Sequence, residues 1–437
     1  MLSVPFAAWL DRRGIHYAVV IVAVTFFAML TTAGTMGLPG ALIVPLGKEF
    51  GWDTAQVSSA LALRILLFGL MGPFSAALIE HYGLRRIILA AILLIAAALA
   101  GAFVMQRLWH LVLLWGILAG LGTGMTAVVL GAIVANRWFV KHRGLVLGLL
   151  TASMATGQLV FLPLAATLVE HFGWRAALMP SFAALLVAAV LVLLFLRDKP
   201  SDLGLAAFGA DPAGEPAAAP AGSPRRAVGR AISLLAEGLG QPAFIILATT
   251  FFICGLSTNG LIQTHLIPFC GDFGMPPVEA ASVLAMMGVF DFFGTIGSGW
   301  LSDRVDSRWL LFWYYGLRGL SLLYLPSSTF TFFGLSLFAV FYGLDWIATV
   351  PPTVKLATVN FGRDKASIMF GWIFTAHQLG AATAAYGAGL SRSELLTYLP
   401  AFYTAGAACL VAALLAASIG RASFLGIPLR PAKAAAE

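Results

Sequence analysis

Long, unbroken apolar stretches constrain this chain more than any other feature of its sequence. A helix needs about 20 apolar residues to cross the hydrocarbon core of a bilayer. We place twelve such stretches, at residues 17–46, 54–79, 86–105, 108–136, 144–169, 174–196, 242–269, 277–301, 309–327, 330–354, 366–390 and 397–419. They lack the short alternating pattern of barrel strands. The sequence therefore predicts an all-α membrane protein with twelve transmembrane helices.

Composition indicates a lipid rather than an aqueous surrounding. Charged residues make up 10% of the chain and hydrophobic residues 60%, whereas a soluble domain carries about 25% charged residues. The first stretch is too long for a signal-peptide core of about 7–15 residues, so we interpret it as a retained span. Cys254, Cys270 and Cys409 have the spacing of neither a disulfide framework nor a metal site. We expect no metal and no cofactor.

The chain also repeats itself. Residues 35–51 align without a gap with residues 258–274, at an offset of 223, and six of the seventeen positions are identical. The same offset carries Gly120 to Gly343 and Gly157 to Gly380. Internal repeats of this kind mark duplicated structural units. We therefore expect two pseudo-symmetric bundles of six helices each.

A polar segment separates the two sets of six stretches. Residues 211–230 are rich in Pro, Ala and Gly and bury too little apolar surface to fold. We therefore expect an N-terminal bundle at 1–196, a flexible cytoplasmic linker at 197–240 and a C-terminal bundle at 241–437.

The distribution of basic residues predicts the orientation of the chain. Of the 26 Lys and Arg residues, 19 fall on the side of the termini and the linker, and 4 fall on the other side. Positive charge concentrates in cytoplasmic loops, so we expect a multi-pass protein of the cell (inner) membrane with both termini in the cytoplasm. This distribution accounts for the net charge of +7 without a nucleic-acid partner.

Twelve spans in two sets of six, with a cytoplasmic central loop, resemble the major facilitator superfamily. Residues 299–308 read Gly-Trp-Leu-Ser-Asp-Arg-Val-Asp-Ser-Arg, which is similar to the family's loop signature of Gly, three residues, Asp-Arg and a basic cluster. Asp306 stands where that signature has a second Gly. The corresponding first-half loop keeps Gly83 and two arginines but replaces the acid with Glu80 and the following Arg with His81.

Such a carboxylate stands at a helix end, where it can pair with basic side chains of the neighbouring loop. The pair would latch one conformation and break in the other. The alternative is a solvated turn that only carries cytoplasmic positive charge. We expect a conformational latch formed by Glu80, Arg85, Arg86, Asp303, Arg304 and Arg308.

A narrower resemblance concerns residues 138–145, Trp-Phe-Val-Lys-His-Arg-Gly-Leu, followed by Gly148, Ala152 and Gly157. They look like the segment that enters span five in the monocarboxylate transporter branch, which also includes oxalate–formate exchangers. The resemblance implies a small organic anion as cargo, often with a proton. The branch's span-eight Asp, followed four residues later by Arg, is here Asp291 followed by Thr295. If that Arg holds the carboxylate in the branch, this protein must hold it elsewhere or carry something else.

Charged residues inside the expected spans are candidates for that role. Each costs at least about 2.5–3.5 kcal/mol at the centre of a helix and must face a partner or water. Arg64 offers a bidentate fork to a carboxylate; its alternative is a backbone carbonyl or a distant acid. Asp291, Arg318 and Asp345 are expected at similar depths in neighbouring helices. They form either a structural charge network or one in which an acid carries the proton.

The second half carries more polar groups within its spans than the first. Asn259 and Gln263 are four residues apart and share one helix face. His377 could titrate near physiological pH, or it could be a buried neutral histidine bonded to a carbonyl. We predict a substrate site formed by Arg64, Asn259, Gln263 and His377.

Nucleotide-binding and hydrolytic motifs are missing from the sequence, so we expect a transporter and not an enzyme. We predict a monomeric secondary active transporter that moves a small organic anion, for example a monocarboxylate, by alternating access. Proton symport or exchange would drive it. The alternatives are efflux of a small hydrophobic compound, a non-transporting membrane sensor of the same fold and an intramembrane enzyme.

Overall fold

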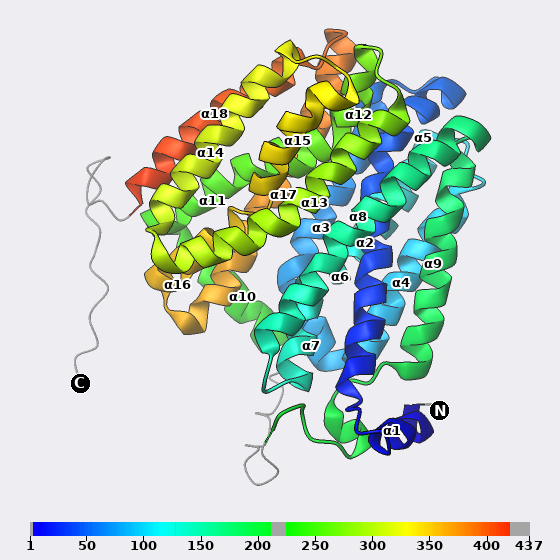
Figure 1. Ribbon diagram of the computed structural model, residues 1–437, viewed down its shortest axis with the longest axis vertical. Helices are drawn as coiled ribbons and strands as arrows, with labels where there is room; N and C mark the ends of the chain where they lie inside the picture. The colour runs from blue at the N-terminus through cyan, green and yellow to red at the C-terminus, as the bar shows by residue number, and fades with distance from the viewer. Residues whose placement is uncertain (1–2, 127, 211–223, 420–437) are drawn as a thin grey trace.

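The computed structural model describes residues 3–126, 128–210 and 224–419. It leaves undescribed the side chains of a few helical positions, among them Glu80 and Asp303. Within the described ranges the chain is a bundle of helices without a β-sheet, and helices of the N-terminal half lie beside those of the C-terminal half (Figure 1). The all-helical part of the sequence prediction is thus confirmed.

Helices follow one another closely in the first half. The long ones are α2 (Ala18–Phe50), α3 (Thr54–Tyr82), α4 (Leu84–Ala102), α8 (Arg143–Phe172) and α9 (Trp174–Phe195). Residues 108–138 form α5 (Leu108–Leu111), the π-helix η1 (Val112–Ala119), α6 (Gly120–Met125) and α7 (Val128–Trp138). Gly51 ends α2 in the left-handed conformation, and the Asp53 carboxylate accepts the Gln56 N–H at 2.7 Å to begin α3. A short helix, α1 (Ser3–Asp11), precedes them.

The second half follows the same plan. A first long stretch consists of α11 (Pro242–Gly255), the π-helix η3 (Leu256–Ile262) and α12 (Gln263–Asp272). It is followed by α13 (Pro277–Arg304), α14 (Ser307–Tyr324), α15 (Phe332–Asp345), α16 (Val350–Phe361), α17 (Arg363–Glu394) and α18 (Leu399–Ser418).

In the described part of the chain, nine helical stretches are long enough and apolar enough to cross a membrane. The helices α8, α14 and α17, at three of the twelve expected spans, are not among these nine. The chain is therefore a multi-pass helical protein, and twelve spans remain a prediction.

Two segments of residues 197–240, which the sequence predicts to be a flexible linker, are helical in the structure. Helix α10 (Pro224–Leu239) packs on α3, α11 and α17, because Ala231 and Leu234 share one buried face. Residues 200–203 form a short 3₁₀ helix, and the Phe208 N–H donates to the Trp138 carbonyl at 2.8 Å. Residues 211–223 lie outside the described part of the chain.

Buried apolar side chains form two clusters. One draws on residues between 10 and 196. The other draws on residues between 234 and 419, together with Ala41, Leu162 and Ala166. Each half of the chain therefore has a core of its own, with a small shared seam.

Close backbone contacts recur at corresponding positions of the two halves. A Cβ built on Gly120 would lie 3.0 Å from the Arg64 carbonyl oxygen, and one on Gly343 would lie 2.5 Å from that of Met287. Gly343 corresponds to Gly120, and Met287 corresponds to Arg64, at the same offset of 223 residues. The repeated glycines thus allow equivalent helices to approach closely in each half.

Among the described residues, the most extensive contacts between the halves are those of α3 with α17, α8 with α13 and α2 with α12. A Cβ on Gly69 of α3 would overlap the Cβ of Gln378 on α17, and the Thr375 hydroxyl donates to the Gly69 carbonyl at 3.3 Å. Gly40 of α2 lies against the backbone of Gln263 on α12. Glycine thus brings polar residues of the second half up to α2 and α3.

Replacing Gly255 with alanine is expected to destabilise the second half. The added methyl group would overlap the His377 carbonyl oxygen of α17, which backbone movement alone can relieve. Overpacking of this kind costs about 1–3 kcal/mol. We expect a clear fall in the Tm of the purified protein in detergent. Gly387→Ala, at a position of α17 with no atom within 4 Å, is the control, and equal Tm values for the two variants would refute this packing.

Candidate functional site

A small cavity of about 30 Å³ lies where the two halves meet. This volume holds one or two water molecules. It is lined by residues of α2 and α3 from the first half and of η3, α12 and α17 from the second, namely Met36, Pro39, Leu61, Arg64, Ile65, Phe68, Asn259, Gln263, Thr264 and Gln378. The structure thus brings together three of the four predicted substrate-binding residues: Arg64, Asn259 and Gln263.

Local helix irregularities shape this cavity. Pro39 lies within α2, where it cannot donate to the carbonyl four residues earlier. Asn259 lies in the π-helical turn η3, and Gln263 begins α12 directly after it. Wider π-helical turns within α-helices occur frequently at functional sites. The lining of the cavity is therefore set by irregular backbone on both sides.

Arg64 is buried, with 5% of its surface exposed. Its Nη2 donates to the Thr35 carbonyl at 3.0 Å and approaches the Thr35 hydroxyl at 3.5 Å. The ion pairs found in the described part of the chain do not include Arg64. A guanidinium has five N–H donors, so donors remain for a ligand. The cavity therefore contains a positive group suited to a carboxylate.

Gln378 is a cavity residue that sequence reasoning missed. Its side chain is 1% exposed, and neither its Oε1 nor its Nε2 has a hydrogen-bond partner among the described residues. The Nε2 of Gln263 is in the same situation. The one sequence signal for Gln378 is that it is a polar residue within an expected span. This signal does not tell where the side chain points.

His377 does not line this cavity, although it precedes Gln378. Its ring stacks on Phe374, with centroids 5.6 Å apart, and lies 5.0 Å from the ring of Phe251. Successive residues of an α-helix point about 100° apart, so the two neighbours face different surroundings. His377 therefore lies outside the set of residues that line the cavity with Arg64.

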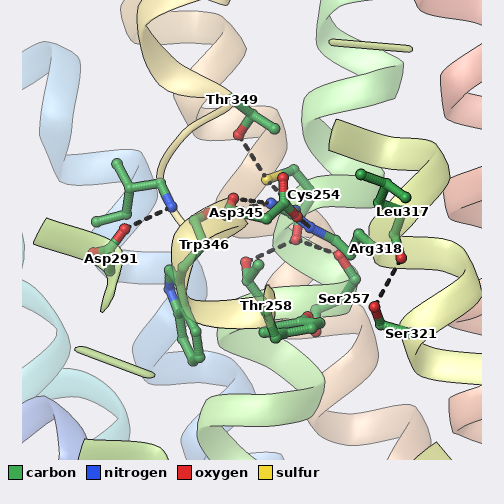
Figure 2. Close-up of polar contacts among 12 residues, drawn as sticks. Cys254, Ser257, Thr258, Asp291, Leu317, Arg318, Ser321, Asp345, Trp346 and Thr349 are labelled. Carbon is green, nitrogen blue, oxygen red and sulfur yellow. Dashed lines mark hydrogen bonds and ion pairs between the residues drawn. The ribbon is translucent and has the colours of Figure 1, made fainter. Parts of the chain in front are cut away.

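Arg318 and Asp345 form a buried ion pair between α14 and α15, with Nε and Oδ2 2.5 Å apart (Figure 2). The same guanidinium donates from Nη2 to the carbonyls of Asp345 and Trp346 at 2.7 and 3.2 Å. Its Nη1 lies 2.9 Å from Cys254 Sγ. The pair of charges expected from the sequence thus exists, and Arg318 also binds the C-terminal carbonyls of α15.

Asp291 reaches the same place from α13, as Figure 2 shows. Its Oδ1 accepts hydrogen bonds from the Ile347 N–H at 2.9 Å and from the Thr295 hydroxyl at 3.1 Å. Among the ion pairs of the described chain, none includes Asp291. Asp291 and Arg318 therefore meet at the backbone of residues 345–347 and not through each other.

That backbone is the break between α15 and α16. Pro351 and Pro352 have no N–H to offer to the carbonyls of residues 347 and 348, and Ser298 donates to the Ala348 carbonyl at 2.5 Å. Buried backbone groups must be paired. The charged residues predicted as a network thus satisfy the backbone of an interrupted helix.

Three of the predicted latch arginines, Arg85, Arg304 and Arg308, contact groups of their own half. Arg85 contacts the Leu193 carbonyl, Arg304 lies over the Trp300 ring, and Arg86 is exposed. Arg308 pairs with Asp306 at 2.5 Å, and this hydrogen-bonded guanidinium holds the pKa of the Asp306 carboxyl below its usual value. The side chains of Glu80 and Asp303, the two acids of the prediction, lie outside the described residues.

Comparison with known proteins places these observations in a family. The model of the Major Facilitator Superfamily matches residues 2–385. Monocarboxylate transporter 13 of Rattus norvegicus is 27% identical over 395 residues, covering 89% of this chain and 85% of the relative. Monocarboxylate transporter 4 of the same species is 25% identical over 406 residues, or 90% and 81%. The MFS-type transporter YcxA of Bacillus subtilis (strain 168) is 24% identical over 358 residues, or 80% and 82%.

Proposed function

Because this chain belongs to the major facilitator superfamily, we propose that it is a secondary active transporter of a small organic anion. The family and the apolar helices make it an integral multi-pass membrane protein, and a transporter rather than an enzyme. The relatives named as monocarboxylate transporters are consistent with a monocarboxylate as cargo. The substrate, the coupling and the mechanism are parts of the proposal.

The proposed architecture has twelve spans in two bundles, residues 1–196 and 241–437, joined by the segment 197–240. The recurring glycine contacts and the separate apolar clusters support it. The excess of basic residues on one side supports cytoplasmic termini in the inner membrane. We propose a monomer, in which the bundles move against each other around the cavity.

The observation that supports the proposal most strongly is how few hydrogen-bond partners the buried Arg64 guanidinium has. A buried guanidinium needs a compensating anion or several hydrogen bonds, and the described chain gives it one residue, Thr35, as partner. A carboxylate accepts two parallel N–H bonds from such a fork. The surrounding Leu61, Ile65 and Phe68 suit a short carbon skeleton. Arg64, Asn259 and Gln263 are thus the proposed substrate-binding residues.

A proton gradient or anion exchange would supply the energy. Arg318 and Asp345 neutralise each other, whereas Asp291 accepts two hydrogen bonds from uncharged donors. We assign the proton to Asp291 for this reason. The two loops around Glu80 and Asp303 would latch the bundles on the cytoplasmic side during the cycle.

Counterflow in proteoliposomes tests this function. Vesicles loaded with an unlabelled carboxylate are expected to accumulate the labelled carboxylate transiently. If the protein is a proton symporter, an inward proton gradient should increase the rate of this uptake. Vesicles that contain the Arg64→Met variant serve as the control, since the anchor is lost without adding bulk. If no member of a panel of short carboxylates exchanges in reconstituted, folded protein, the proposed function is wrong.

A further inference from the structure

We propose that Gln378 and Gln263 bind a hydroxyl group of the cargo, so that the protein prefers hydroxy-substituted carboxylates over the unsubstituted acids. This inference rests on the proposed function and deepens it. The two side chains line the cavity that contains Arg64. They come from α17 and α12, whereas Arg64 comes from α3, so a ligand in the cavity meets three separate helices.

The unpaired amide atoms define the chemistry of this second group. In folded proteins, buried polar atoms are nearly always hydrogen-bonded to protein, water or a ligand. Three amide atoms of these two cavity-lining residues, Gln378 Oε1, Gln378 Nε2 and Gln263 Nε2, have no partner among the described residues. An exchange of the oxygen and nitrogen assignments of Gln378 leaves this conclusion unchanged, because both of its atoms are unpaired.

The set of atoms selects a hydroxyl group. Two of the three atoms are amide nitrogens that donate and one is an amide oxygen that accepts, and a hydroxyl can both donate and accept. A keto oxygen only accepts, so it would leave the Gln378 oxygen unpaired. A methylene group would leave all three atoms unpaired. The expected order of preference is therefore hydroxy acid, then oxo acid, then unsubstituted acid.

Gln378 is held in place by the other half of the molecule. Its Cβ and Cγ lie against Gly69 of α3, where a Cβ would overlap them. One turn earlier, the Thr375 hydroxyl donates to the Gly69 carbonyl at 3.3 Å. The aliphatic part of the side chain therefore belongs to a packed seam between the halves, which limits the positions that the amide can take before cargo binds. Such preorganisation favours specificity, because a wrong ligand leaves fixed polar groups unpaired.

The experiment compares matched pairs of carboxylates in proteoliposome exchange: glycolate with acetate, lactate with propionate, and 3-hydroxybutyrate with butyrate. Pyruvate is measured beside lactate as the oxo acid. The unmodified protein is expected to exchange the hydroxylated member of at least one pair about tenfold or more faster, measured as kcat/KM. Gln378→Leu keeps the volume and removes both polar atoms. It is expected to lower exchange of the hydroxy acid about tenfold and to change exchange of the unsubstituted acid less than about twofold.

Gln263→Leu is the second variant. It is expected to lower exchange of the hydroxy acid more than exchange of the unsubstituted acid, and this difference tests the proposal if Gln378→Leu does not fold. Thr383→Val, at an exposed position of α17, is the matched control and should leave both rates unchanged. Equal rates for the two members of every pair, or an equal loss for both in the glutamine variants, would show that the amides hold only water. In that case anion exchange and its dependence on Arg64 would persist. Loss of all carboxylate exchange in the unmodified protein would instead overturn the proposed function and this inference together.

Discussion

Replacing Arg64 with lysine is expected to lower carboxylate exchange by about 10- to 100-fold in kcat/KM, because one charge-assisted hydrogen bond contributes about 1.5–3 kcal/mol. Lysine keeps the positive charge but loses the planar fork that binds both carboxylate oxygens. It also loses the contact with the Thr35 carbonyl, which now fixes the guanidinium at 3.0 Å. Initial rates of labelled-anion exchange over a range of concentrations measure the effect.

The control for Arg64→Lys is the same substitution at Arg175. That side chain forms an exposed ion pair with Glu49 at 2.6 Å, away from the cavity. Exposed ion pairs contribute about 0–1 kcal/mol, so Arg175→Lys should leave exchange within about twofold. If Arg64→Lys exchanges the same anion with the rate and affinity of the unmodified protein, Arg64 is not the anchor.

Replacing Arg318 with methionine is expected to destabilise the folded protein by about 3–5 kcal/mol, the usual cost of leaving one charge of a buried pair alone. Asp345 would lose its cation, and the carbonyls of Asp345 and Trp346 would lose their shared donor. We therefore expect a large fall in Tm, measured on the purified protein in detergent, or a failure to accumulate in the membrane.

Two variants separate the ion pair from general effects of the substitution. The double variant Arg318→Met with Asp345→Leu removes both charges and should recover part of the lost stability. Lys365→Met breaks an exposed pair with Glu237, whose side chains are 42% and 40% exposed, and should cost about 0–1 kcal/mol. Equal Tm values for Arg318→Met and Lys365→Met would contradict the structural role of the buried pair.

Many helix positions could be predicted from the sequence, because a helix that crosses the lipid core needs about 20 apolar residues. The expected span at 54–79 begins where α3 begins, since Asp53 provides the cap. The π-helical turn η3 could not be predicted, because its apolar pattern does not differ from that of an α-helix. Helix α10 was missed for another reason: its Pro-rich surroundings suggested an unfolded linker, although Ala231 and Leu234 have helical spacing.

The candidate site was partly predictable for an electrostatic reason. A charge within an apolar span must be sheltered, which pointed to Arg64 and to the pair of Arg318 and Asp345. The direction of each side chain depends on how its helix is rotated, and tertiary packing sets that rotation. Sequence reasoning therefore chose His377 and missed its neighbour Gln378. The contacts of Arg318 with the backbone depend on the interruption between α15 and α16, which no pattern of charges reveals.

Accessibility of the cavity from both sides of the membrane tests the central claim most directly. A cysteine at Met36, which lines the cavity beside Arg64, can be labelled with a membrane-impermeant maleimide in vesicles of either orientation; the native cysteines are all buried. We predict that active Met36→Cys protein reacts from each side, and that a transported carboxylate slows both reactions. Reaction from one side only, or no effect of the carboxylate, would contradict alternating access around this cavity.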